Sequence, residues 1–242
     1  MRNFLATVMV VAIALAAKST TAAAVCGDVN DNGKVTSADA LAVLRKAVGQ
    51  SVELICAQSS TPAQTGETVS HGPGSDGNVQ AGTPRQFTDN GDGTVTDDAT
   101  GLMWEKKDRS GGLHDVENTY SFSATGTDMD GTLATDFLAG INAGGGFAGH
   151  TDWRIPNVVE LETIKNFGDG FNASTFAEFD SDCAASCTVA DCSCTRLDSY
   201  WSSTTHANNP IEGWIVGFNG PGTDPAGKIG SFKPVRAVRN AN

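Results

Sequence analysis

The sequence has little positive charge, few aromatic residues and, after its first residues, no apolar run long enough to span a membrane. Aromatic residues make up 7% of the 242 residues, and 16 Lys and Arg stand against 28 Asp and Glu, for a formal net charge of −12. A nucleic-acid partner requires a basic footprint, because nucleic acid is a polyanion. The acidic balance therefore argues against nucleic acid as a partner and fits a soluble extracellular protein.

The motifs of common catalytic sites are also missing. The chain has no Gly-x-Ser-x-Gly, no His-Glu-x-x-His and no P-loop. None of its 4 histidines stands in a nucleophile pattern. We therefore expect a protein that is not an enzyme.

The first 24 residues have the features of a secretory signal peptide. Arg2 supplies a positive charge, and residues 4–17 form an apolar run shorter than the roughly 20 residues of a membrane span. The small residues Ala22–Ala24 then form a cleavage pattern. A lipoprotein signal is the weaker reading, because Val25 rather than a small residue precedes Cys26. The mature protein is expected to be secreted, either extracellular or at the cell surface.

Three regions of the mature chain differ in composition. Residues 25–56 form a short module, and residues 57–84 contain Ser, Thr, Gln, Gly and three prolines but no aromatic residue. Such a segment cannot bury enough apolar surface to offset its ordering entropy, so we expect a flexible linker. Residues 85–242 contain all 4 Trp of the protein and have the length of one domain.

The short module contains a calcium-binding pattern. Short oxygen-bearing side chains alternate along residues 28–39, and Gly33 stands where such a loop turns sharply. Calcium takes six to eight oxygen ligands, and this spacing wraps them around one point. A simple turn is the alternative, but the following apolar residues at helical spacing, Leu41, Leu44, Ala47 and Val48, argue against it. The candidate ligands are Asp28, Asn30, Asn32, the Lys34 carbonyl, Thr36 and Asp39.

Residues 27–49 resemble a dockerin type I repeat, an EF-hand-like loop followed by one helix. The matching residues are Gly27–Asn30, Gly33–Val35 and Asp39–Leu41. This resemblance implies a cohesin-like protein as a partner. Dockerins carry two repeats and this chain has one, so high-affinity docking does not follow. A bridge between Cys26 and Cys56 would close the module.

The other four cysteines, Cys183, Cys187, Cys192 and Cys194, form a C-x3-C-x4-C-x-C pattern. Tetrathiolate zinc sites usually show C-x2-C pairs, and export favours disulfides over thiols. We therefore favour two local disulfides over a zinc site. Nested pairing, Cys183 with Cys194 and Cys187 with Cys192, is preferred, although the spacing leaves other pairings open. A loop cross-braced in this way could display a recognition surface.

The residues after 85 predict short strands and one capped helix. Phe87–Asp97 reads as a hairpin around Gly91-Asp92-Gly93, with a second calcium site at its aspartates as the less favoured alternative. Asn157 and Glu160 form a capping box at a helix start. Further strands are expected at residues 200–205, 213–218 and 235–239, with the Trp side chains mostly in the core.

The region Phe87–Arg239 resembles the C-terminal domain of the Legionella collagen-like adhesin, long classed as a domain of unknown function. The resemblance is carried by FTDNGDGTVTD–TGLMW, GHTDWRIPNVVEL, YWSST and VRAVR. It implies an α+β, C-type lectin-like fold of antiparallel strands with few helices. Ala237 stands where relatives often have a cysteine. The sugar-binding triplets of C-type lectins are absent, since Ile155-Pro156-Asn157 lacks the carboxylate.

Together these features predict a secreted or surface-exposed calcium-binding protein that binds a glycan or a surface ligand and has no catalytic activity. One alternative is a purely structural module. Another is an accessory or enzyme component of an extracellular polysaccharide-degrading assembly, docked through the dockerin-like repeat. The enzyme reading would require a carboxylate pair at glycosidase spacing, about 5–10 Å.

Overall fold

The computed structural model describes residues 40–41, 44–45, 47–49, 62–169, 173–220 and 222–241. The chain divides into two compact units, Met1–Ala57 and Gln58–Asn242. In the first unit the described residues 40, 41, 44, 45 and 47 are helical, as expected after the calcium loop. Leu41, Leu44 and Val48 of this unit are exposed.

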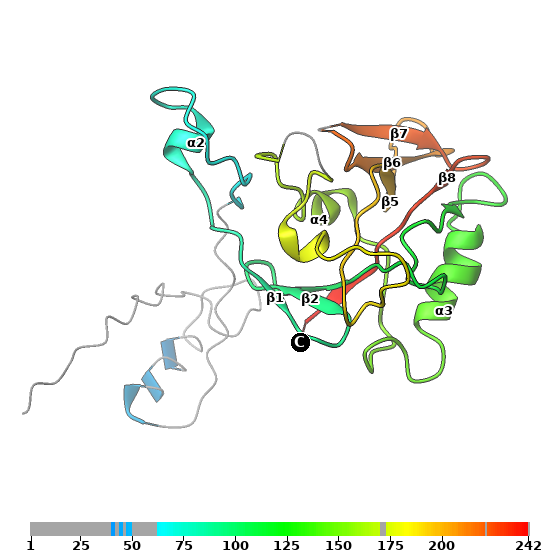
Figure 1. The fold of residues 1–242 in the computed structure, drawn as a ribbon, viewed down its shortest axis with the longest axis horizontal. Helices are drawn as coiled ribbons and strands as arrows, with labels where there is room; N and C mark the ends of the chain where they lie inside the picture. Colours follow the sequence, from blue (N-terminus) through cyan, green and yellow to red (C-terminus); the bar gives the residue numbers. More distant parts are fainter. Residues whose placement is uncertain are drawn as a thin grey trace, which may run out of the picture. The chain divides into compact units, whose positions relative to one another are not determined.

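The second unit is built on three antiparallel sheets (Figure 1). The largest has the order β1-β2-β3-β9, formed by Phe87–Asp89, Thr94–Asp97, Leu102–Glu105 and Val238–Asn240. A second sheet contains β5 (Ser199–Thr205), β6 (Glu212–Gly217) and β7 (Thr223–Gly227), and β4 (Tyr120–Ser121) pairs with β8 (Phe232–Lys233). The helices are α2 (Asp76–Val79), the π-helix η1 (Leu133–Leu138), α3 (Ala139–Ile141), α4 (Val158–Glu162) and the 3-10 helix η2 (Ala177–Phe179).

This architecture confirms the predicted α+β class with antiparallel sheets and few helices. The C-type lectin-like fold stays a prediction. No helix in the described part of the chain has the length and apolar character needed to cross a bilayer.

The predicted hairpin is confirmed as β1 and β2, with Phe87 opposite Asp97. Its turn contains Gly93 at φ 94°, a conformation that glycine adopts without the steric cost of a Cβ. A Cβ at Gly93 would also lie 2.7 Å from a methyl carbon of Val189 and 2.9 Å from the ring of Phe147. Glycine is therefore required here both for the turn and for close packing of two later loops.

The predicted capping box at the start of α4 is also confirmed. The Asn157 side chain accepts a hydrogen bond from the Glu160 backbone N–H, and the Glu160 carboxylate accepts one from the Asn157 N–H. Glu160 also pairs with Arg154 at 2.6 Å. The Ile155-Pro156-Asn157 triplet thus starts a helix.

The closing strand differs from the prediction. We expected residues 235–239 to be a strand, but β9 is Val238–Asn240. Upstream of it, the Ala237 N–H donates to the side-chain carboxylate of Glu105, at 2.8 Å, rather than to a backbone carbonyl of a neighbouring strand. Val235, Ala237 and Val238 are buried, and Arg236 is 1% exposed.

Two large apolar clusters and a smaller one around Val116, Cys192 and Cys194 form the core of this unit. Trp153 and Trp201 lie in one large cluster, with Phe137 and Ile215, and Trp104 lies in the other large cluster. These three tryptophans are at most 3% exposed, so the expectation that Trp is mostly core is confirmed. Trp214 is partly exposed on β6.

The described part of the predicted linker, residues 62–84, contains secondary structure. Ala63 pairs with Thr83 in an isolated bridge, and α2 lies between them. The Phe167 N–H donates to the Thr65 carbonyl at 2.9 Å, which joins the segment to the loop after α4. The boundaries of the three predicted regions stay predictions.

Candidate functional site

The four cysteines of the C-terminal domain form the nested disulfides Cys183–Cys194 and Cys187–Cys192. This confirms both the choice of disulfides over a zinc site and the preferred pairing. The loop also has backbone support from residues far away in the sequence. The Arg109 N–H donates to the Cys187 carbonyl, and the Arg109 carbonyl accepts from the Ser186 N–H. The loop is therefore fixed to the strand-like segment that follows β3.

Beside this loop lies a cavity of about 420 Å³. That volume is within the range of natural small-molecule sites. The cavity has a mixed polar and apolar lining and is open to solvent at a place where loops from three parts of the chain meet. Its lining includes Arg109, Glu117, Asp180, Cys183, Thr195, Arg196 and Leu197.

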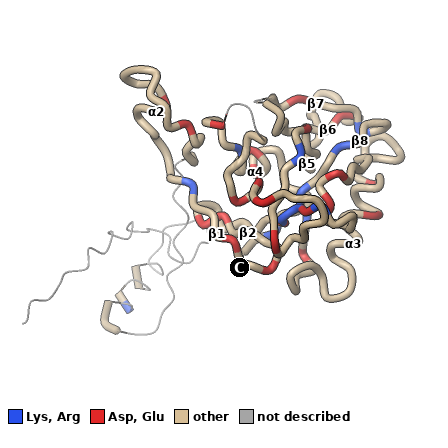
Figure 2. Tube along the Cα trace, in the orientation of Figure 1, with Lys and Arg blue, Asp and Glu red and all other residues tan. Residues whose placement is uncertain are grey.

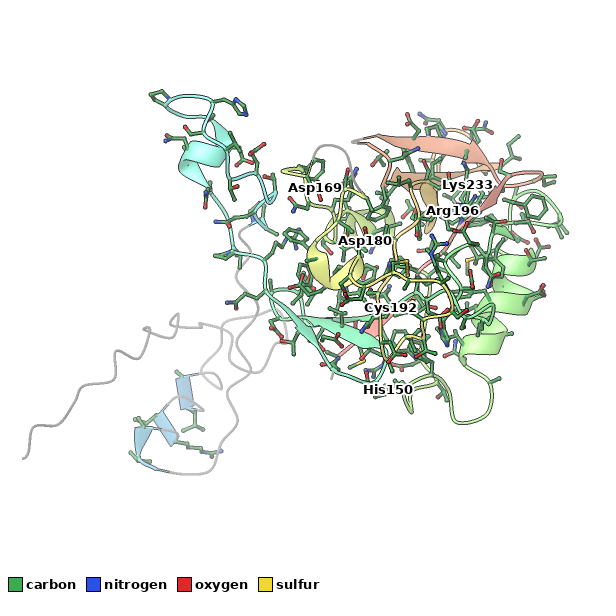
Figure 3. The ribbon with its side chains drawn as sticks, viewed as in Figure 1. His150, Asp169, Asp180, Cys192, Arg196 and Lys233 are labelled. Carbon is green, nitrogen blue, oxygen red and sulfur yellow. A yellow bond between two sulfur atoms is a disulfide. The ribbon has the colours of Figure 1, made fainter. Side chains whose placement is uncertain are left out.

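Three charged side chains of the cavity, Arg109, Glu117 and Arg196, belong to a row of alternating charges on the surface. Glu117 bridges Arg109 at 3.1 Å and Arg196 at 3.6 Å. Asp198 continues the row to Arg196 at 3.6 Å and to Lys233 at 3.4 Å. Figure 3 shows Arg196 and Lys233 lying close together. We call the five paired residues the surface charge row: Arg109, Glu117, Arg196, Asp198 and Lys233.

The surface charge row is accessible. The Arg109 side chain is 43% exposed and that of Glu117 is 55% exposed. Exposed pairs of this kind contribute little to folding, about 0–1 kcal/mol each. Basic residues are also sparse along the trace, whereas acidic ones are spread over it (Figure 2). Three cations in one row are therefore a local departure from an acidic chain.

A second group of charges lies beneath the cavity, inside the core. The Glu105 carboxylate pairs with Lys107 Nζ at 3.0 Å and with His114 Nδ1 at 2.7 Å. Arg236 donates to the backbone carbonyl oxygens of Glu105 and Cys194, at 2.9 and 2.7 Å. We call Glu105, Lys107, His114 and Arg236 the buried charge cluster. Through Arg236 it fixes one end of the disulfide loop.

The pKa values inside this cluster follow from burial and pairing. Burial by itself raises the pKa of Glu105. The neighbouring Lys107 charge and the hydrogen bond to His114 lower that pKa by more than burial raises it, so the net pKa is below its ordinary value. Burial lowers the pKa of Lys107 despite the attraction of Glu105. Burial raises the pKa of the Tyr200 phenol to about 12. Glu105 is thus held as a carboxylate.

The predicted calcium ligands all lie outside the described residues. This applies to Asp28, Asn30, Asn32, Lys34, Thr36 and Asp39.

The aspartates of the β1–β2 hairpin have separate partners. Asp89 pairs with Lys106 at 2.8 Å, and Asp92 accepts from the backbone and hydroxyl of Thr94. Asp97 is buried and accepts from the N–H groups of the turn that follows β2. Hairpin chemistry therefore accounts for these side chains.

Sequence reasoning identified the disulfide loop but missed Arg109, Glu117 and Arg196. Arg109 and Glu117 lie 79 or more positions before Arg196, and the three follow no motif. A local signal did exist for Arg196, which comes two residues after the last cysteine of the loop.

The structure defines a domain of antiparallel sheets with a disulfide-braced loop. The family model of the Lcl C-terminal domain matches residues 93–239, more than half of the chain, and the chain belongs to this family. The match supports the predicted resemblance to the C-terminal domain of the Legionella collagen-like adhesin. A comparison with curated proteins gives no match.

Proposed function

We propose that the chain is a secreted or surface-exposed binding protein whose C-terminal domain holds a glycan in the cavity beside the disulfide loop. The observation that carries this proposal is the mixed lining of that cavity. Arg109 and Arg196 offer N–H donors, whereas Glu117 and Asp180 offer acceptors. Sugar hydroxyls both donate and accept, so they match such a lining. Leu197, 58% exposed, adds an apolar surface for the C–H face of a sugar ring.

Two further observations support a binding role for these side chains. The exposed ion pairs of the surface charge row contribute little to stability, so folding alone gives little reason for their arrangement. The loop that carries Cys183 is braced by two disulfides and by hydrogen bonds to Arg109. A fixed wall lowers the entropy lost when a ligand binds.

The test is binding of the purified chain to an array of extracellular polysaccharides and oligosaccharides. A double variant, Arg109→Ala with Arg196→Ala, should lose at least tenfold in affinity, because each guanidinium supplies a charge-assisted hydrogen bond worth about 1.5–3 kcal/mol. The matched control is Arg154→Ala, an exposed arginine that pairs with Glu160 on α4. Equal binding by the double variant and the wild type would refute the cavity as the site.

The same array separates the alternatives. Release of shortened sugars would favour the enzyme component of a polysaccharide-degrading assembly, in which Glu117 and Asp180 would be the first carboxylates to replace. Absence of binding to any glycan, with the fold intact, would favour the purely structural module.

The N-terminal module is proposed to bind calcium through Asp28, Asn30, Asn32, the Lys34 carbonyl, Thr36 and Asp39. The sequence spacing supports this, since it supplies oxygen ligands around a glycine turn. Calorimetric titration should show one site that is lost in both Asp28→Ala and Asp39→Ala. No heat and no calcium-dependent shift in Tm would refute it. A cohesin-like partner is a further proposal that this titration leaves separate.

A further inference from the structure

The two disulfides of the loop touch each other. Cys194 Sγ lies 3.9 Å from Cys192 Sγ, although these sulfurs belong to different bonds. The sulfur atoms of Cys187, Cys192 and Cys194 all lie within 4.8 Å of one another, and Cys183 is bonded to this group through Cys194. A thiolate released at Cys194 would find the next disulfide already beside it.

Of these four cysteines, Cys183 is the one that lines the cavity. Cys183 is exposed, whereas Cys194 and Cys192 are 0% and 1% exposed. The Arg109 side chain donates from Nε to Cys183 Sγ at 3.1 Å. A cation beside a sulfur attracts an incoming thiolate and stabilises the charge that develops during exchange. An external thiol would therefore reach Cys183 first.

We propose that the cavity is also a thiol-capture site, at which an external thiol becomes covalently attached to Cys183. The incoming thiol loses its proton and attacks Cys183 Sγ as a thiolate, which forms a mixed disulfide and breaks the Cys183–Cys194 bond. Cys194 leaves as a thiolate and attacks Cys192 Sγ. A Cys192–Cys194 bond forms, the Cys187–Cys192 bond breaks, and Cys187 leaves as a thiolate that takes up a proton. No external oxidant or reductant is required.

The second step makes the capture persistent. After it, Cys194 is bonded to Cys192 and no longer attacks the mixed disulfide to expel the captured thiol. The loop also has support that survives the exchange. Ser181 and Ser193 pair through two backbone hydrogen bonds of 2.7 and 2.9 Å, and Arg109 contacts the loop backbone at Ser186. The exchange can therefore proceed without unfolding of the domain.

The experiment incubates the full chain with reduced glutathione, alkylates free thiols and maps all cysteines by peptide mass spectrometry. We expect glutathione on Cys183, an alkyl group on Cys187 and a new Cys192–Cys194 bond. A parallel arm replaces glutathione with a large unfolded polypeptide that has one cysteine. Capture in both arms identifies an open site for protein thiols, and capture of glutathione alone identifies a site for small thiols.

Two variants sharpen the test. Arg109→Gln should slow adduct formation roughly threefold to tenfold, whereas Arg154→Gln should leave the rate unchanged. Replacing both Cys187 and Cys192 by Ser should make the adduct reversible, because Cys194 then has no second disulfide to attack. An adduct on Cys187, reduction of both disulfides without a stable adduct, or no adduct would each overturn the proposal. The mass-spectrometric readout does not depend on glycan binding, so a failure of the thiol-capture proposal can be distinguished from a failure of the glycan-site proposal.

Discussion

The buried charge cluster and the surface charge row use the same residue types in opposite ways. In the buried cluster, Glu105 and Lys107 are both at most 1% exposed, and their charges compensate each other at 3.0 Å. In the surface row, Glu117 pairs with Arg109 at a similar distance, 3.1 Å, with side chains about half exposed. Distance therefore does not distinguish the two pairs, and burial does.

Burial decides what each pair can contribute. Removing one partner of a buried pair leaves an uncompensated charge in a poorly solvated environment, whereas water replaces the partner of an exposed pair. The buried cluster therefore fixes the fold beneath the cavity, through Arg236 and its bonds to Glu105 and Cys194. The surface row is free to exchange its internal partners for those of a ligand.

The largest expected effect is at Glu105. Glu105→Gln should destabilise the domain by about 3–5 kcal/mol, because Lys107 and Arg236 lose their compensating carboxylate in the core. Denaturant unfolding at neutral pH measures this. The matched control is Glu117→Gln, which should cost at most about 1 kcal/mol. Similar losses for the two variants would remove the distinction between cluster and row.

The same carboxylate predicts a dependence of stability on acid. The folded-state pKa of Glu105 lies below its ordinary value, so its contribution is present above the unfolded pKa of about 4.3 and is lost as pH falls through the folded pKa. The difference in free energy of unfolding between the wild type and Glu105→Gln should shrink as the pH falls below about 4. A constant difference would contradict this linkage.

A smaller effect is expected at the inner disulfide. Replacing Cys187 and Cys192 by Ser opens a short loop, which should cost about 2 kcal/mol through the entropy of the unfolded chain. Glycan affinity should fall as well, because the loop that forms the cavity wall becomes less fixed. Thermal unfolding and array binding of the same variant measure both. A loss of stability without any loss of affinity would show that glycan binding does not depend on the disulfide-braced loop.

Much of the fold was predictable because its signals are local. The hairpin at Gly91–Gly93 and the capping box at Asn157 each depend on residues within a few positions of one another, and both are confirmed. Strand β7 was missed because TDPAG carries a proline, which marks it as an edge strand. The π-helix η1 was missed, and its N-cap residue Thr132 makes no side-chain cap hydrogen bond.

The contacts of the site were predictable only where the two contacting residues are close in the sequence. The nested disulfides close within twelve residues, so spacing indicated the pairing. Arg109, by contrast, reaches Cys183 across 74 positions of sequence, and Arg236 reaches Glu105 across 131. Only the packing of the sheets brings such residues together.

The most direct test of the cavity as the ligand site is one measurement on three proteins. Glycan-array binding is compared for the wild type, for Arg109→Ala with Arg196→Ala, and for Arg154→Ala, after unfolding experiments establish that all three are folded. The expected result is at least a tenfold loss in the double variant, unchanged binding in Arg154→Ala, and stabilities within about 1 kcal/mol of one another. Unchanged binding in the double variant, or an equal loss in both variants, would contradict a binding site beside the disulfide loop.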